Sequence, residues 1–198
     1  MLLVRTTRFQ RGKLPHWEVE GGRYFITIRL ADSLPREIVL RLQEIHRGLS
    51  GIEPQSPRSA ALQRQYFLAM EKYLDAGAGA CVLRDAHLAK IVIEELIGLS
   101  EWLVEAVHFT IMPNHIHGLL VPQPGCSSTL ADIMKRLKGR SGHRIREALG
   151  GSGPVWQREW FDRWMRDEFE WEKTVRYIQE NPVKAGLVAR WQDHPWTR

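Results

Sequence analysis

Two apolar stretches separated by a Pro-Asn pair constrain the fold of this chain more than any other feature. Residues 102–112 and 115–121 are short and rich in β-branched and aromatic residues, a composition that favours strands. Pro113-Asn114 interrupts the apolar run at a point where the chain could turn back. We therefore predict a β-hairpin or a bulged strand pair here.

The second of these strands carries a His-x-His motif, His115 and His117. Side chains alternate between the two faces of a strand, so both imidazoles point the same way, with Cα atoms about 6.5–7 Å apart. Two such imidazoles can bind one divalent cation, although this ligand type does not select the metal. The alternative is a pair of surface histidines without a catalytic role. Burial in so apolar a stretch is costly unless the ring nitrogens are satisfied.

Strands and helices alternate in the rest of the chain. We predict strands at residues 24–30 and within 155–166, and helices at residues 35–49, 60–76, 86–99, 128–148 and 167–180. This order favours an α+β fold in which helices pack against an antiparallel sheet. The length of 198 residues predicts one domain over residues 1–198.

Loops and helix ends are indicated by glycine, proline and capping residues. Residues 1–22 are expected to form a basic N-terminal arm, irregular in its second half, and residues 50–60 a Ser/Pro/Gly loop. Thr129 and Asp132 resemble a capping box, and two glycines weaken the helix that follows. Pro182 predicts the end of the last helix.

Positive charge is concentrated at both ends of a chain with a formal net charge of +5. Residues 134–146 hold six lysines and arginines and no acidic residue. Such a segment attracts phosphates and is typical of nucleic-acid binding, whereas the alternative is a solvated helix face. The candidate DNA contacts are Arg5, Arg8, Arg11, Lys13, Lys135, Arg136, Lys138, Arg140, Arg144 and Arg146.

The last predicted helix has two distinct faces. Trp171, Val175 and Ile178 fall at i, i+4 and i+7 and predict its buried stripe. Tyr177 lies off that stripe and shares a face with Asn181, one turn away. A hydroxyl and an amide there could serve a metal or phosphate site. Alternatively, Tyr177 is an ordinary tyrosine at the boundary of the core.

Several features argue against a membrane or secreted protein. No apolar run approaches the roughly 18–20 residues that a membrane-spanning helix needs, and the first residues lack the apolar segment of a signal peptide. The two cysteines, Cys81 and Cys126, suggest neither a disulfide framework nor a zinc-binding spacing. We expect a cytoplasmic protein with no membrane partner, associated with the nucleoid when bound to DNA.

Five segments occur together in this chain: MPNHIHGLL, the basic helix after it, WQREWFDRWMRDE, YIQENPVKAGLV and DHPWTR. Together they resemble the REP-associated tyrosine transposases of the HUH-type single-tyrosine transposase superfamily. The resemblance runs from about residue 10 to the C-terminus and is least distinctive over residues 50–100. It implies a ferredoxin-like fold with the HUH motif on a central strand, and a catalytic helix within residues 155–198.

The resemblance also implies a site and a reaction. His115 and His117 would bind the metal, Tyr177 would be the nucleophile, and Asn181 would take the place of the third ligand. Insertion-sequence members usually carry glutamine there. With Mg²⁺ or Mn²⁺, such an enzyme would nick and rejoin single-stranded DNA at or near palindromic hairpins through a 5′-phosphotyrosine intermediate. One tyrosine holds one cleaved end, so strand exchange requires a homodimer or sequential use of the tyrosine.

Two other functions remain open at the level of sequence. A regulator on the same fold would bind DNA hairpins without metal-dependent cleavage. An unrelated His-x-His metalloenzyme would turn over a small phosphoester, which leaves the cations of residues 134–146 unexplained.

Overall fold

The computed structural model describes residues 6–11, 15–19, 21–49, 52 and 56–198. A four-stranded antiparallel sheet lies at its centre, with strand order β4-β5-β3-β6. Its strands are β3 (Arg23–Arg29), β4 (Val104–Ile111), β5 (His115–Pro122) and β6 (Phe161–Met165). Helical segments connect β3 to β4 and β5 to β6, so the order is β-α-β-β-α-β, that of a ferredoxin-like fold. The predicted α+β class is therefore confirmed.

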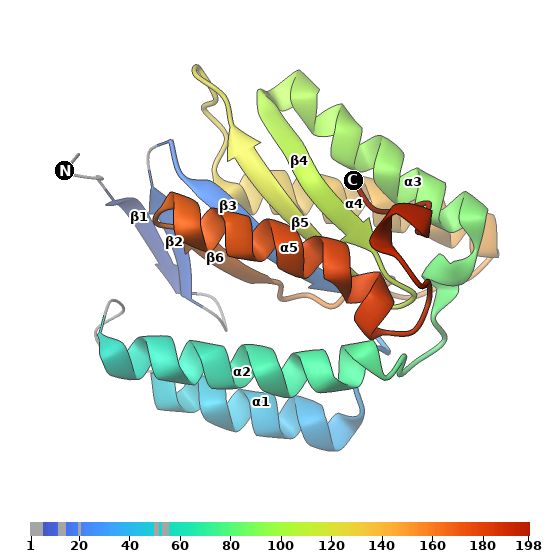
Figure 1. Ribbon diagram of the computed structural model, residues 1–198, viewed down its shortest axis with the longest axis horizontal. Helices are drawn as coiled ribbons and strands as arrows, with labels where there is room; N and C mark the ends of the chain where they lie inside the picture. The colour runs from blue at the N-terminus through green and yellow to red at the C-terminus, as the bar shows by residue number, and fades with distance from the viewer. Residues whose placement is uncertain (1–5, 12–14, 20, 50–51, 53–55) are drawn as a thin grey trace.

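Helices cover both faces of the sheet (Figure 1). They are α1 (Arg36–Leu49), α2 (Pro57–Asp75), α3 (Ala86–Ile97), α4 (Leu130–Leu149) and α5 (Glu168–Lys184). Short 3₁₀ segments occur at Val82–Arg84, Gly98–Trp102 and Trp191–Asp193. Helices α3 and α4 pack on one face of the sheet, and α1, α2 and α5 pack on the other.

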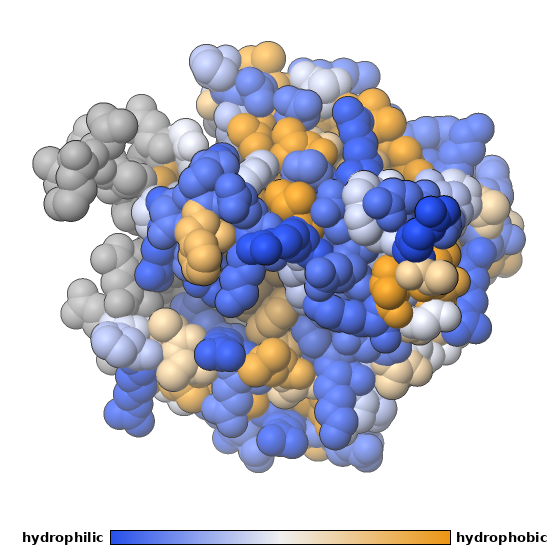
Figure 2. All heavy atoms as spheres, viewed as in Figure 1, coloured by the Kyte–Doolittle hydropathy of each residue, from blue (hydrophilic) through white to orange (hydrophobic). Residues whose placement is uncertain are grey.

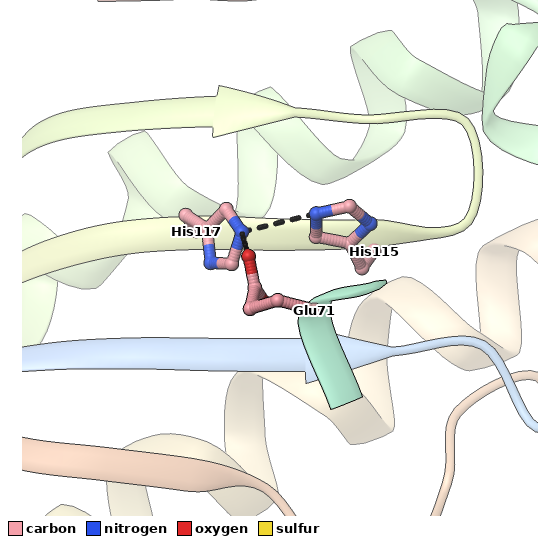
Figure 3. A group of neighbouring side chains, drawn as sticks. All are labelled: Glu71, His115 and His117. Atoms are coloured by element: carbon pink, nitrogen blue, oxygen red, sulfur yellow. Dashed lines mark hydrogen bonds and ion pairs between the residues drawn. The ribbon is translucent and has the colours of Figure 1, made fainter. Parts of the chain in front are cut away.

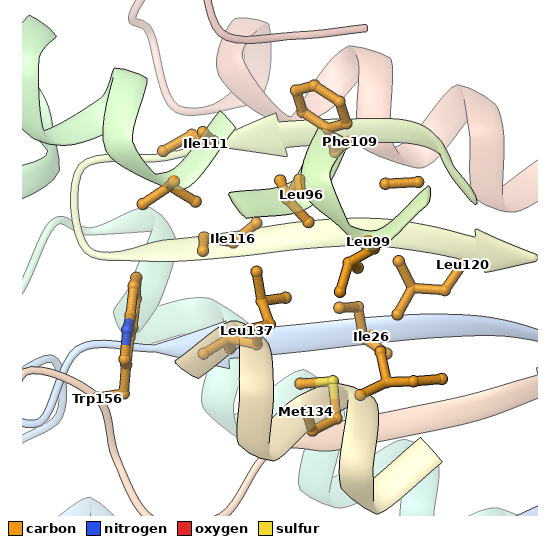
Figure 4. Close-up of a cluster of buried hydrophobic side chains, with 14 of the residues drawn as sticks. Ile26, Leu96, Leu99, Phe109, Ile111, Ile116, Leu120, Met134, Leu137 and Trp156 are labelled. Atoms are coloured by element: carbon orange, nitrogen blue, oxygen red, sulfur yellow. The ribbon is translucent and has the colours of Figure 1, made fainter. Parts of the chain in front are cut away.

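The larger core lies between the sheet and the α3–α4 layer (Figure 4). Ile26 of β3 and Ile116 of β5 are fully buried and face Leu96 of α3 and Leu137 of α4. Because side chains alternate along a β-strand, the residues directly before and after each isoleucine face the opposite layer. Each large side chain buried in this way stabilises the fold by about 1.5–3 kcal/mol, which holds the inner strands at fixed positions.

The N-terminal segment differs from the expected irregular arm. Strands β1 (Thr6–Arg11) and β2 (Pro15–Val19) pair as a separate two-stranded antiparallel ribbon. Ladder hydrogen bonds between the two segments order this part of the backbone, and neither segment reveals that pairing when it is considered alone. Of the predicted DNA contacts, Arg8 and Arg11 lie on β1, whereas Arg5 and Lys13 lie outside the described residues.

The last helix continues past its predicted end. Helix α5 contains Pro182 and ends at Lys184. A proline in the final turn removes only one intrahelical donor, and the backbone is otherwise well bonded there. The N–H groups of Ala185 and Leu187 donate to the carbonyls of Asn181 and Pro182. The prediction that Pro182 ends this helix is therefore wrong.

The predicted loop at 50–60 is shorter than expected, because α2 begins at Pro57. The Ser56 side chain caps the helix by accepting from the Ser59 N–H. Proline is favoured in the first turn, where its missing N–H costs nothing. The predicted capping box of Thr129 and Asp132 is confirmed at the start of α4.

The two glycines of α4 are expected to respond differently to substitution by alanine. A Cβ at Gly142 would lie 3.1 Å from Cδ1 of Trp156, whereas one at Gly139 would meet open space. We expect Gly139→Ala to raise the free energy of unfolding by about 1 kcal/mol through helix propensity. Gly142→Ala should lower it by about 1 kcal/mol, because the new methyl group displaces the indole. Urea unfolding of both variants tests this, and equal stabilisation would contradict it.

Polar side chains dominate the face that carries α5. Figure 2 shows apolar side chains there only in small, separate groups. Among the described residues, no helix combines the length and the apolar character that crossing a bilayer requires.

Candidate active site

The two histidines of the His-x-His motif lie on β5, one of the two inner strands. Both are fully buried and face the layer formed by α2 and α5. Their Nε2 atoms are 3.0 Å apart (Figure 3). The alternative of two surface histidines is thereby excluded, because neither ring is exposed to solvent.

The opposite nitrogen of each ring has its own partner. His115 Nδ1 lies 2.7 Å from Oδ1 of Asn114, whose amide donates to the carbonyl of Ala78. His117 Nδ1 lies 2.9 Å from the Thr27 hydroxyl. Such outer contacts fix the orientation of metal-binding imidazoles. Here they direct both Nε2 atoms toward a common point.

A third group, which sequence reasoning missed, reaches this point from α2. Glu71 places Oε2 3.4 Å from His117 Nε2 (Figure 3). Ligand atoms of Glu71, His115 and His117 all lie within 4.8 Å of one another. The sequence carries one signal for Glu71: it shares the buried helical stripe of Met70 and Leu74. A buried glutamate in such a stripe requires a partner.

Helix α5 brings the predicted tyrosine to the same cluster. The Tyr177 hydroxyl lies 3.2 Å from His117 Nε2 and donates a hydrogen bond to Glu71 Oε2. Asn181, one turn later on the same helix, is buried. The structure therefore brings together the four residues that the sequence predicted separately, His115, His117, Tyr177 and Asn181.

Two buried oxygens of the site favour a bound cation. Among the described residues, Oε1 of Glu71 and Oδ1 of Asn181 have no hydrogen-bond partner. Buried acceptors without a donor are costly, and a cation is one way to satisfy them. Two imidazoles with carboxylate and amide oxygens form a donor set that fits a divalent metal.

The charges in the cluster also favour a bound cation. Burial, with a contribution from His117, lowers the pKa of His115 to about 3, so this imidazole is neutral. Burial and the charge of Glu71 raise the pKa of Tyr177 far above its ordinary value. Burial acts to raise the pKa of Glu71, but His117 and Tyr177 outweigh it, so the net direction is down. The result is an ionised carboxylate beside the neutral imidazole of His115 and the neutral phenol of Tyr177, which attracts a cation.

The depressed pKa of His115 makes stability depend on pH. Below pH 6.5 the unfolded chain binds a proton at this residue, whereas the folded chain does not until about pH 3. Stability is therefore fully present above pH 6.5 and is lost as the pH falls through this window, at up to about 1.4 kcal/mol per unit. Between pH 6.5 and 5, the wild type should lose about 2 kcal/mol more than His115→Asn. Urea unfolding in a chelator measures this, and parallel pH profiles would contradict it.

The basic helix α4 lies on the opposite face of the sheet from the histidines. Arg140 and Arg144 pair with Glu95 of α3 at 2.6 and 2.9 Å, and Arg136 pairs with Glu101 at 2.9 Å. Glu95 is buried, whereas the three arginines are partly exposed. A pair with a buried carboxylate exchanges for a phosphate less readily than a fully exposed pair does. The predicted role of these arginines as DNA contacts stays a prediction.

The remaining cations of α4 have different surroundings. Lys135 is exposed, and Arg146 donates to the carbonyl of Gly153 at 3.4 Å. Lys138 is half-buried, donates to the carbonyl of Arg158 and lies 5.2 Å from the ring centroid of Trp160.

Part of the chain is similar to a transposase family and to curated proteins. The family model described as "Transposase IS200 like" matches residues 85–181, which contain the histidines, Tyr177 and Asn181 but not Glu71. Two curated Haemophilus influenzae proteins are similar. One, called an uncharacterized protein, is 30% identical to this chain, and the match covers 38% of this chain and 52% of the relative. The other, named as a REP-associated tyrosine transposase, is 31% identical, and the match covers 47% of this chain and 57% of the relative. The chain thus spans about half the length of these relatives.

A solved structure shares the fold. It is described as a REP-associated tyrosine transposase bound to a REP hairpin, and the match has a TM-score of 0.51 at 18% identity. It covers 96% of this chain and 81% of the other. Residues 85–181 thus match the transposase IS200-like family model, and the chain resembles the REP-associated tyrosine transposases.

Proposed function

We propose that this protein is a metal-dependent nickase and strand transferase of single-stranded DNA, with Tyr177 as its nucleophile. The observation that carries the proposal is the hydroxyl of Tyr177, 3.2 Å from His117 in a cluster that can hold a cation. A tyrosine next to such a cluster is positioned to attack a phosphate that the same cation binds.

The chain's own residues support a metal at this point. His115 and His117 would supply Nε2, and Glu71 and Asn181 would supply the oxygens that have no other partner among the described residues. When bound, Mg²⁺ or Mn²⁺ supplies positive charge that polarises the scissile phosphate and favours the phenolate over the phenol. Oxygen donors suit both ions, and the imidazoles suit Mn²⁺ better.

In the proposed reaction the two oxygens of Glu71 have different roles. Oε1 would face the metal, and Oε2 would act as the base. Glu71 Oε2 already accepts from the Tyr177 hydroxyl, so it would take the phenolic proton as the tyrosine oxygen attacks phosphorus. The tyrosine–phosphorus bond forms and the bond from phosphorus to the 3′-oxygen breaks. Glu71 then returns the proton to the departing oxygen, so that charge and atoms balance. The products are a 5′-phosphotyrosine and a 3′-hydroxyl, and the reverse reaction rejoins the strand.

Palindromic hairpins are the proposed form of the DNA. Support comes from the solved relative, which is described as bound to a REP hairpin, and from the basic residues of α4. The test mixes the protein with labelled single-stranded DNA from either side of its gene, in Mn²⁺, Mg²⁺ or EDTA. A denaturing gel should show a covalent adduct with the metals only. Hairpin binding without an adduct would identify the regulator instead, and hydrolysis of a small phosphodiester without an adduct would identify the unrelated metalloenzyme.

A further inference from the structure

Arg29, the last residue of β3, is a buried cation that has no anionic partner among the described residues. The residue is 8% exposed, and its Nη1 has no hydrogen-bond partner in the part of the chain that the structure describes. Tyr66 acts on the guanidinium electrostatically, and no described carboxylate forms an ion pair with it. Burial lowers the pKa of Arg29, yet a guanidinium stays charged in proteins. A buried charge with no counter-charge is strongly unfavourable, so this group requires an anion.

The strand register places Arg29 beside the histidine cluster. Arg29 lies directly opposite His115 in the β3–β5 ladder, and Thr27 lies opposite His117. Residues opposite each other in an antiparallel pair share a face of the sheet. The hydrogen bond from Thr27 to His117 confirms that this is the site's face. The backbone of Arg29 therefore lies directly across from a residue of the histidine cluster.

We propose that Arg29 forms a subsite for a phosphodiester of the DNA backbone, near the phosphate that Tyr177 attacks. This inference rests on the proposed function. The planar fork of a guanidinium matches two phosphate oxygens. Because Arg29 is buried and its Nη1 is closed off from solvent, binding requires the helical layer on this face of the sheet, which includes α2, to move. DNA would then reach Arg29 and Glu71 in the same event.

The test compares variants in a Tyr177→Phe background, so that binding is measured without cleavage. The probe is a fluorescent single-stranded oligonucleotide from beside the gene, in saturating Mn²⁺, with inorganic phosphate as competitor. Arg29→Met should weaken binding about 10- to 100-fold, the effect of one charge-assisted contact. The DNA affinity of Arg29→Lys should lie between those of Arg29→Met and the wild type. The control, Arg23→Met on the same strand, removes a cation that already pairs with Glu168 and should change binding by about twofold at most.

The melting temperature separates this role from a structural one. Without DNA, Arg29→Met should melt at or above the wild-type temperature, because it removes an unpaired buried charge. A lower melting temperature, or unchanged DNA binding, would overturn the proposal. If Arg29→Met does not fold, the comparison of Arg29→Lys with wild type decides. Competition by inorganic phosphate alone, with equal DNA binding in Arg29→Met, would assign the subsite to free phosphate and also overturn it.

This inference and the proposed function fail separately. Weaker DNA binding by Arg29→Met, together with an adduct that persists in Tyr177→Phe, would leave the phosphate subsite standing and remove the nickase assignment. Unchanged DNA binding by Arg29→Met, together with loss of the adduct in Tyr177→Phe, would support the nickase assignment and contradict the phosphate subsite.

Discussion

Tyr177→Phe is expected to abolish covalent attachment to DNA, with a loss of at least about 10³-fold in the rate of adduct formation. Phenylalanine keeps the ring contacts with His117 and Phe25, whose centroids lie 5.2 and 5.9 Å from that of Tyr177. The substitution removes only the oxygen that would bond to phosphorus. Hairpin binding should therefore stay within about twofold of wild type, as for changes that leave packing intact. A denaturing gel measures the adduct, and a mobility shift measures binding.

A second tyrosine provides the matched control. Tyr73 lies on α2, is partly buried and packs at the edge of the same apolar cluster. Tyr73→Phe makes the same chemical change outside the histidine cluster and should leave adduct formation unchanged. If Tyr177→Phe still forms an adduct at the wild-type rate, another residue is the nucleophile. If Tyr73→Phe also loses it, the loss reflects packing rather than chemistry.

The strand motif and the last helix could be predicted because their information is local. The two-residue period of a strand fixes His115 and His117 on one face, and the helical period separates Tyr177 from the buried stripe. The resemblance then connects these elements. A site residue that comes from another element cannot be predicted from local periodicity. Glu71 meets Tyr177 across 106 positions of sequence, and no period relates α2 to α5.

The surroundings of the basic residues likewise could not be predicted from the charge pattern. Six cations predict a basic helix at α4, but their acidic partners lie on other elements, such as Glu95 on α3. The sequence gives no indication that this helix packs on the face opposite the histidines. Arg29 looks like an ordinary strand residue until the register places it opposite His115. In each case the missing information is a tertiary contact, which fixes partners that composition and spacing leave undetermined.

Glu71→Gln is expected to weaken Mn²⁺ binding by at least about 10- to 100-fold, the usual loss when the support of a metal site is removed. Glutamine has the same shape but no charge, so the packing of α2 is kept. Isothermal titration with Mn²⁺ measures the affinity directly. The comparison is Asp75→Asn, one turn later on α2, because Asp75 acts on His117 and Tyr177 through its charge but lies outside the set of convergent ligand atoms. The loss of Mn²⁺ affinity should be clearly smaller for Asp75→Asn than for Glu71→Gln.

The same substitution also distinguishes a ligand from a group that only blocks the site. A carboxylate that merely occupied the cation's place would leave when metal binds, so Glu71→Gln would then bind Mn²⁺ as well as or better than wild type. A ligand also sets the order of events, because an unneutralised Glu71 beside Tyr177 repels the scissile phosphate. Metal should therefore bind before DNA enters the site. In wild type, DNA affinity should rise on adding Mn²⁺, and in Glu71→Gln most of that rise should disappear.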